Sequence, residues 1–142
     1  MKASRTNYLV DAGPLVGLLS ESDQWHDWSW RTLAVIDEPL LTTETALAEA
    51  CHLIGRYNRS ALLEVTKMLA DGRLGAIPVL SQHPARIGEL LAKYPEMDAG
   101  DATLVVLSEL YPRAKLITVD DDFRRYRRLR NQVIPVVIPE NL

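Results

Sequence analysis

The sequence predicts an α/β fold in which helices flank a mostly parallel sheet. Short apolar segments suited to buried strands alternate along the chain with longer segments of helical apolar spacing. The strand segments are residues 8–10, 40–42, 76–80, 116–119 and 133–138. Two of them, 8–10 and 116–119, run directly into an aspartate. Because ligands of an open parallel sheet gather beyond the carboxyl ends of its strands, these aspartates mark the predicted site.

The helices are placed by apolar spacing and by the residues that bound them. A short helix follows the Gly13-Pro14 turn, and the later helices span about 24–35, 44–57, 60–70, 83–94 and 102–110. Thr43 and Asp98 stand where the N-caps of two of these helices are needed. Since proline cannot donate to a central ladder, segment 76–80, with Pro78, is predicted to be an edge strand.

Length and composition favour one globular domain spanning residues 1–142. Apolar residues make up 47% and charged residues 25%, which argues against disorder, and the net charge of −3 predicts no partner by itself. The single cysteine, Cys51, excludes an internal disulfide and a cysteine-based zinc cluster. No apolar run approaches the ~20 residues of a membrane helix, and no signal peptide is evident. We therefore expect a cytoplasmic protein without a membrane partner.

Four carboxylates are the candidates for chemistry. Asp11 and Asp120 occupy equivalent positions after two strands, although Asp11 could equally cap the following helix. Glu49 interrupts an apolar helical stripe, and a buried carboxylate is costly unless it is paired or bound to a cation. A pair with Arg56 is the alternative to a ligand role. Asp101 falls in the first turn of a helix, where the helix dipole favours negative charge.

Carboxylates that converge in a cleft repel one another, and without a cation some of them would have to bind protons. A hard divalent ion relieves this repulsion, and oxygen ligands suit Mg²⁺ or Mn²⁺ rather than zinc. Such ions activate water and stabilise phosphoryl transition states, which indicates phosphodiester hydrolysis. Asp98, Thr118 and Asp122 flank the candidate ligands, and we expect them to contact the ligands or the metal-bound water rather than the metal itself.

Four segments carry a family resemblance: Leu9–Leu15, Thr43–Glu49, Met97–Val105 and Leu116–Phe123. In order and spacing they resemble the motifs of PIN-domain ribonucleases, in particular the toxin-like VapC group. The resemblance implies a three-layer α/β/α sandwich with a central, mostly parallel sheet. It also implies that four acids gather around Mg²⁺ or Mn²⁺ as metal ligands and catalytic residues, namely Asp11, Glu49, Asp101 and Asp120.

The resemblance further implies an endoribonuclease that acts as the toxin of a type II toxin–antitoxin pair. Its expected partners are an RNA substrate, an antitoxin protein and a second copy in a homodimer. One departure is that many such toxins follow the first aspartate with Thr, Ser or Asn, whereas this chain has Ala12-Gly13. The chain therefore lacks a hydroxyl at that position.

A run of arginines follows Asp120: Arg124, Arg125, Arg127 and Arg128. The default interpretation is a solvated face, but beside an acidic cleft these guanidinium groups could hold RNA phosphates, with Tyr126 stacking on a base. The tryptophans Trp25, Trp28 and Trp30 could also stack bases, although helical spacing favours packing or a subunit interface.

Two other classes of function are alternatives to a nuclease. A phosphoacceptor receiver domain also gathers acids around Mg²⁺, but it needs an aspartate after the third strand and a lysine after the fifth. The sequence has Leu80-Ser81 and Pro139-Glu140 at those places, which excludes it. A catalytically silent RNA-binding or protein-interaction module remains the alternative.

Overall fold

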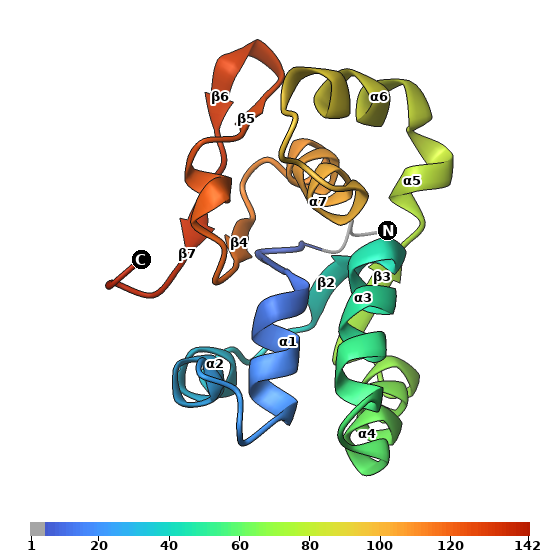
Figure 1. Cartoon of the computed structure of the whole chain (residues 1–142), viewed down its shortest axis with the longest axis vertical. Helices are drawn as coiled ribbons and strands as arrows, with labels where there is room; N and C mark the ends of the chain where they lie inside the picture. The colour runs from blue at the N-terminus through green and yellow to red at the C-terminus, as the bar shows by residue number, and fades with distance from the viewer. Residues whose placement is uncertain (1–4) are drawn as a thin grey trace.

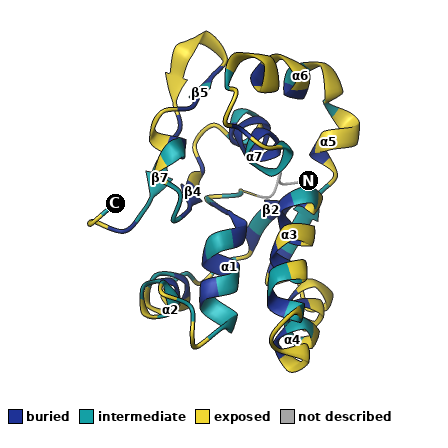
Figure 2. Ribbon diagram, viewed as in Figure 1, coloured by how far each residue is buried: buried dark blue, intermediate teal, exposed yellow. Residues whose placement is uncertain are grey.

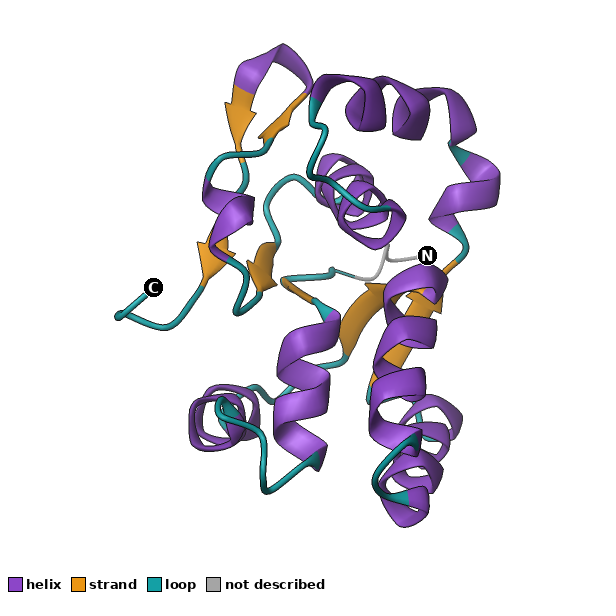
Figure 3. Cartoon of the chain, in the orientation of Figure 1, coloured by secondary structure: helices purple, strands orange, loops and turns teal. Residues whose placement is uncertain are grey.

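The computed structural model describes residues 5–142 and has a five-stranded parallel sheet at its centre (Figures 1 and 3). The strand order is β3-β2-β1-β4-β7, and each neighbouring pair is parallel. The strands are β1 (Tyr8–Val10), β2 (Leu40–Thr43), β3 (Leu74–Ile77), β4 (Lys115–Ile117) and β7 (Val136–Val137). The predicted α/β class and parallel sheet are confirmed.

Helices connect the strands and cover both faces of the sheet. They are α1 (Ala12–Leu19), α2 (His26–Ala34), α3 (Glu44–Gly55), α4 (Arg59–Ala70), α5 (Val79–Gln82), α6 (Pro84–Lys93) and α7 (Ala99–Leu110). Figure 1 shows α5, α6 and α7 on one side of the sheet, and α1 to α4 on the other. No helix among residues 5–142 is long and apolar enough to cross a membrane.

Successive side chains of the central strands point to opposite faces of the sheet, and this creates two separate apolar cores. Leu9 and Leu116 pair in register and pack on the side of α7, whereas Val10 and Ile117 pack on the side of α1 and α3. All four of these side chains are fully buried, and Figure 2 shows burial concentrated on the sheet and on the inner helix faces. The expected three-layer sandwich is therefore present.

Two predicted strands differ from the structure, and both differences involve proline. The edge strand is confirmed but ends at Ile77, because Pro78 turns the chain and Val79 is buried as the first residue of α5. The final segment is split around Pro135 into β6 (Gln132–Val133) and β7. A proline has no N–H with which to continue a ladder.

A small antiparallel hairpin was missed by the sequence analysis. β6 pairs with β5 (Arg127–Arg128), and the chain reverses between them at Arg130 and Asn131, which have φ values of 60° and 58°. Tight hairpins favour two successive residues of positive φ, and sequence usually signals them by Asn-Gly. Here arginine occupies the first of these positions, so the Asn-Gly pair that would predict the turn is absent.

The carboxyl ends of the parallel strands lie at one edge of the sheet, and several helices that start near this edge have polar caps. The side chain of Asp11 caps α1, that of Thr43 caps α3 and that of Asp98 caps α7. Asp120 caps the short 3-10 helix η1 (Asp121–Arg124) that follows β4. In Figure 1, α1 and α3 both start close to the middle of the sheet, below α7. This edge is where the candidate acids meet.

Candidate functional site

Asp11 is the most buried of the candidate acids. It directly follows β1, and its side chain is only 8% exposed. Oδ1 accepts a hydrogen bond from Ala12 N at 2.7 Å, and Oδ2 accepts one from the Thr118 hydroxyl at 2.8 Å. Asp11 therefore does cap α1, and Thr118 supplies a hydroxyl in a chain that lacks one at position 12.

Burial raises the pKa of Asp11 to about 6. The hydrogen bonds from Thr118 and Ala12 oppose this rise, and the charges of Asp120 and Glu49 add to it. Capping a helix does not require other acids nearby, and their charges make ionisation of the capping carboxyl less favourable. The electrostatic contribution of Asp120 and Glu49 therefore places Asp11 in a cluster of negative charge.

Asp120 is joined to Asp11 through the same threonine. The Thr118 hydroxyl, which donates to Asp11, accepts a hydrogen bond from Asp120 N at 3.0 Å. Asp120 Oδ1 accepts from Asp122 N at 2.9 Å. Burial raises the pKa of Asp120, and the charges of Asp122 and Asp98 raise it further. The strand-end aspartates are thus held side by side by one buried hydroxyl.

Asp98 and Asp101 form a reciprocal cap at the start of α7. Asp101 N donates to Asp98 Oδ1 at 2.8 Å, and Asp98 N donates to Asp101 Oδ2 at 3.4 Å. Burial raises the pKa of Asp101 to about 7, with further contributions from the charges of Asp98, Asp11 and Asp120. The structure confirms Asp98 as the cap and places Asp101 within the electrostatic range of both strand-end aspartates.

Glu49 was predicted to be buried because it interrupts an apolar stripe, but its side chain is exposed in the structure. The alternative pair with Arg56 is also absent, since Glu49 forms no ion pair among residues 5–142. A Cβ built on Gly100 would lie 3.7 Å from Glu49 Oε2 and 3.4 Å from Asp98 Oδ1. The Glu49 carboxylate therefore reaches across from α3 to the beginning of α7.

Although Glu49 is exposed, its pKa is raised by partial desolvation and by the charges of Asp98 and Asp120. The four candidate ligands therefore form one electrostatic unit drawn from β1, α3, α7 and the end of β4. Within residues 5–142, no three Asp, Glu, His or Cys side chains converge on a common point closely enough to surround an ion. The donors are nevertheless all oxygens whose mutual repulsion a divalent cation would relieve, so their chemistry fits Mg²⁺ or Mn²⁺.

The arginine run is largely occupied by contacts within the protein. Arg125 pairs with Glu96 and Asp122. Arg124 pairs with Asp121, and it also donates to the Leu142 carbonyl. Arg127 Nη1 donates to the carbonyls of residues 124, 125 and 126. Of these three, Arg124 and Arg125 are exposed and Arg127 is half-buried.

Two expectations from this segment are wrong. Arg128 is only 9% exposed, and its Nη1 donates to Ser108 O, Ser108 Oγ and Pro112 O. Its guanidinium group therefore holds the end of α7 and is not free to bind a phosphate. Tyr126 is completely buried and cannot stack on a base. Its hydroxyl donates instead to Asp101 Oδ2 at 3.4 Å, a contact that no spacing in the sequence indicates.

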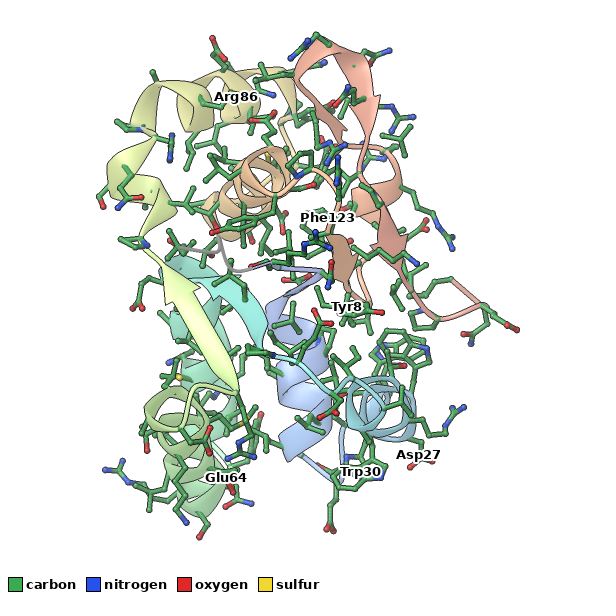
Figure 4. The ribbon with its side chains drawn as sticks, turned by 180° about the vertical axis from the view of Figure 1, so that it is seen from behind. Tyr8, Asp27, Trp30, Glu64, Arg86 and Phe123 are labelled. Atoms are coloured by element: carbon green, nitrogen blue, oxygen red, sulfur yellow. The ribbon has the colours of Figure 1, made fainter. Side chains whose placement is uncertain are left out.

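The three tryptophans do not share one environment. Trp28 packs against the core beneath α1, and together with Trp25 it lines a groove of about 530 Å³ beside Pro139. Trp30 is 58% exposed and lies at the periphery in Figure 4, whereas Phe123 lies near the centre of the molecule. The predicted packing role is confirmed for Trp28.

The raised pKa values predict that the metal-free protein loses stability as pH rises. In the unfolded chain these carboxyls ionise near pH 4, whereas folded Asp11 and Asp101 keep their protons until about pH 6 and 7. The folded state therefore binds more protons across this window, and its stability falls from pH 4 to pH 7. We expect Mg²⁺ to raise the melting temperature more at pH 8 than at pH 5. If calorimetry showed that Mg²⁺ raises the melting temperature equally at both pH values, this would contradict a link between metal binding and ionisation of these carboxyls.

The fold and its acidic edge define the class of protein. A model of the PIN domain matches residues 8–129, and the chain belongs to the PIN domain family. Its fold is also that of the VapC toxins. Mycobacterium tuberculosis VapC20, described as a sarcin-ricin loop cleaving toxin, superposes with a TM-score of 0.73 at 18% identity over 82% of this chain and 92% of that one.

Two complexes share the fold as well. A toxin–antitoxin complex from Klebsiella pneumoniae has a TM-score of 0.66 at 18% identity, covering 92% of this chain and 96% of that one. VapBC2 from Rickettsia felis, bound to a DNA fragment from its promoter, has a TM-score of 0.64 at 15% identity and covers 95% and 100%. No curated protein matches the chain by sequence.

Proposed function

We propose that this protein is a metal-dependent endoribonuclease in which Asp11, Glu49, Asp101 and Asp120 hold Mg²⁺ or Mn²⁺ and carry catalysis. The observation that supports the proposal most directly is the electrostatic coupling of these acids. The four acids come from separate parts of the chain. The pKa of each one is nevertheless raised, first by desolvation and then by the negative charge of at least one other acid. Folding tolerates such repulsion when function requires it, and perturbed pKa values cluster at functional sites.

The residues of the chain divide the work by their surroundings. Thr118 bonds the Asp11 carboxylate and the backbone N of Asp120, and Asp122 N donates to the Asp120 side chain, so the two aspartates form the rigid base of the site. The Glu49 side chain has no hydrogen bond among the described residues and is exposed, so it can adjust to a substrate or accept a proton from water. When bound, a divalent ion would activate a water molecule and stabilise the charge on the phosphoryl group.

RNA is the substrate class we propose, with its backbone held by the arginines that remain on the surface. Arg124 and Arg125 stay exposed beside Asp121 and Asp122, and Arg127 lies next to them. Phosphate contacts of this kind position RNA without reading its sequence. Arg128 is buried and bonded within the protein, so it does not contribute to this surface.

We further propose that the protein acts in the cytoplasm as the toxin of a type II toxin–antitoxin pair and forms a homodimer. The support is the fold shared with VapC20 and with the complexes from Klebsiella pneumoniae and Rickettsia felis. Co-expression with the product of a neighbouring small gene tests the pairing. A stable complex that suppresses RNA cleavage is the expected result, and full activity in the presence of that product would contradict it.

The enzymatic proposal is tested by incubating purified protein with total RNA in Mg²⁺, in Mn²⁺ and in chelator. We expect discrete cleavage products with either metal and intact RNA with chelator. Intact RNA under every condition, from folded protein free of any inhibitor, would contradict the nuclease. Retained RNA binding in that case would favour the silent RNA-binding module instead.

A further inference from the structure

Tyr126 stands out because it is a fully buried tyrosine whose hydroxyl reaches a candidate metal ligand. Its ring makes edge contacts with Tyr94, at 5.0 Å between centroids, and with Phe123, at 5.4 Å. Its backbone N donates to Asp122 O at 3.1 Å. The ring is therefore held by packing and by the backbone, independently of its hydroxyl. A buried tyrosine hydroxyl needs a polar partner, and here that partner is Asp101 Oδ2.

The hydroxyl acts on one particular oxygen of Asp101. Oδ2 accepts from both the Tyr126 hydroxyl and Asp98 N, each at 3.4 Å. Oδ1 accepts no hydrogen bond among residues 5–142. Two donors on one oxygen restrict rotation of the carboxylate and leave the other oxygen available as a ligand. Tyr126 also lies six residues after Asp120, so its hydroxyl connects the segment after β4 to the start of α7.

We propose that Tyr126 is a positioning residue that holds the Asp101 carboxylate in the orientation needed to bind the divalent cation. This inference rests on the proposed function. Outer hydrogen-bond partners of metal ligands typically contribute about 10- to 100-fold to metal affinity, because they fix the orientation of the ligand. The long distances at Asp101 indicate weak individual bonds, so we expect an effect near the lower end of that range.

The experiment is a Mn²⁺ titration of the full chain, followed by electron paramagnetic resonance, in the wild type and in Tyr126→Phe. The variant keeps the ring and removes only the hydroxyl. We expect it to bind Mn²⁺ about 10-fold more weakly while its melting temperature without metal stays within a few degrees of the wild type. In RNA cleavage, the Mn²⁺ concentration for half-maximal activity should rise by about the same 10-fold, while KM for RNA at saturating Mn²⁺ stays unchanged.

Tyr94→Phe is the matched control. Its hydroxyl accepts from Arg127 N at 3.1 Å and has no carboxylate as a hydrogen-bond partner among residues 5–142, while its ring packs on Tyr126. We expect wild-type Mn²⁺ affinity in this variant. Equal weakening in both variants would overturn the inference, because it would assign the effect to aromatic packing. A folded Tyr126→Phe protein with wild-type affinity would overturn it as well.

A second measurement does not depend on how the variant folds. Mn²⁺ added to the wild type and to Tyr94→Phe should perturb the tyrosine absorbance, since the Tyr126 hydroxyl contacts a ligand. Failure to see this change in proteins that do bind Mn²⁺ would overturn the inference and leave the proposed function intact. If the wild type neither binds Mn²⁺ nor cleaves RNA, the proposed function fails, and the inference fails with it.

Discussion

Asp11→Asn is expected to abolish metal-dependent RNA cleavage without destabilising the fold. The substitution removes a charged ligand from the most buried position of the site. Charge stabilisation by a bound metal is worth several kcal/mol at the transition state, so we expect a loss of about 10³-fold or more in kcat. Asparagine is also a good N-cap, and its side-chain oxygen can still accept from Ala12 N.

The stability of this variant separates a functional acid from a structural one. At pH 8 without metal the wild type carries a buried charge beside Asp120 and Glu49, which the variant lacks. We therefore expect a melting temperature equal to or above that of the wild type. Asp121→Asn is the control, because Asp121 is exposed and its one ion pair among residues 5–142 is with Arg124 on the surface. Cleavage retained in Asp11→Asn, or lost equally in Asp121→Asn, would exclude the proposed site.

The parts of the site that could be predicted from sequence are those fixed by strand ends and helix starts. Asp11 and Asp120 follow apolar strands, and parallel strands bring their carboxyl ends to one edge. The positions of Asp98 and Asp101 can be predicted from helix capping, because a capping box places its two side chains three residues apart at the start of a helix. For these residues the position along the chain determines the position in space, because a short strand or a helix start leaves little freedom.

The features that were missed depend on contacts between distant segments. Arg128 and Tyr126 lie in a run of arginines that suggests a solvated surface, yet both are buried. The signal for burial would have been the hairpin at Arg130 and Asn131, which folds this run back against α7. Glu49 shows the converse: its place beside an apolar stripe suggested burial, but the buried face of α3 consists of Ala46, Leu47, Ala50 and Ile54, and Glu49 lies off that face. Periodicity indicates which side of a helix is apolar, but it does not show where the buried face ends around the helix.

Arg128→Met is expected to cause the largest loss of stability outside the site. Nη1 of Arg128 donates to Ser108 O, Ser108 Oγ and Pro112 O, at and just beyond the last turn of α7. A cation there also interacts favourably with the helix dipole. Methionine preserves much of the apolar stem but leaves buried acceptors without donors. Each such acceptor costs roughly 1–3 kcal/mol, so we expect a loss of about 3 kcal/mol in the free energy of unfolding.

One effect opposes this loss, because Arg128 has no carboxylate partner and its buried Nε has no hydrogen bond among residues 5–142. Removing an imperfectly solvated charge returns part of the desolvation cost. We expect the three lost bonds to outweigh this term, and Arg128→Lys, which keeps the charge and donors, to lose less than Arg128→Met. Arg73→Met is the surface control: its ion pairs with Asp71 and Glu64 are exposed and should contribute under about 1 kcal/mol. The measurement is the free energy of unfolding of the three variants in urea. Equal stability of Arg128→Met and Arg73→Met would show that the Arg128 guanidinium group is not needed to hold the end of α7.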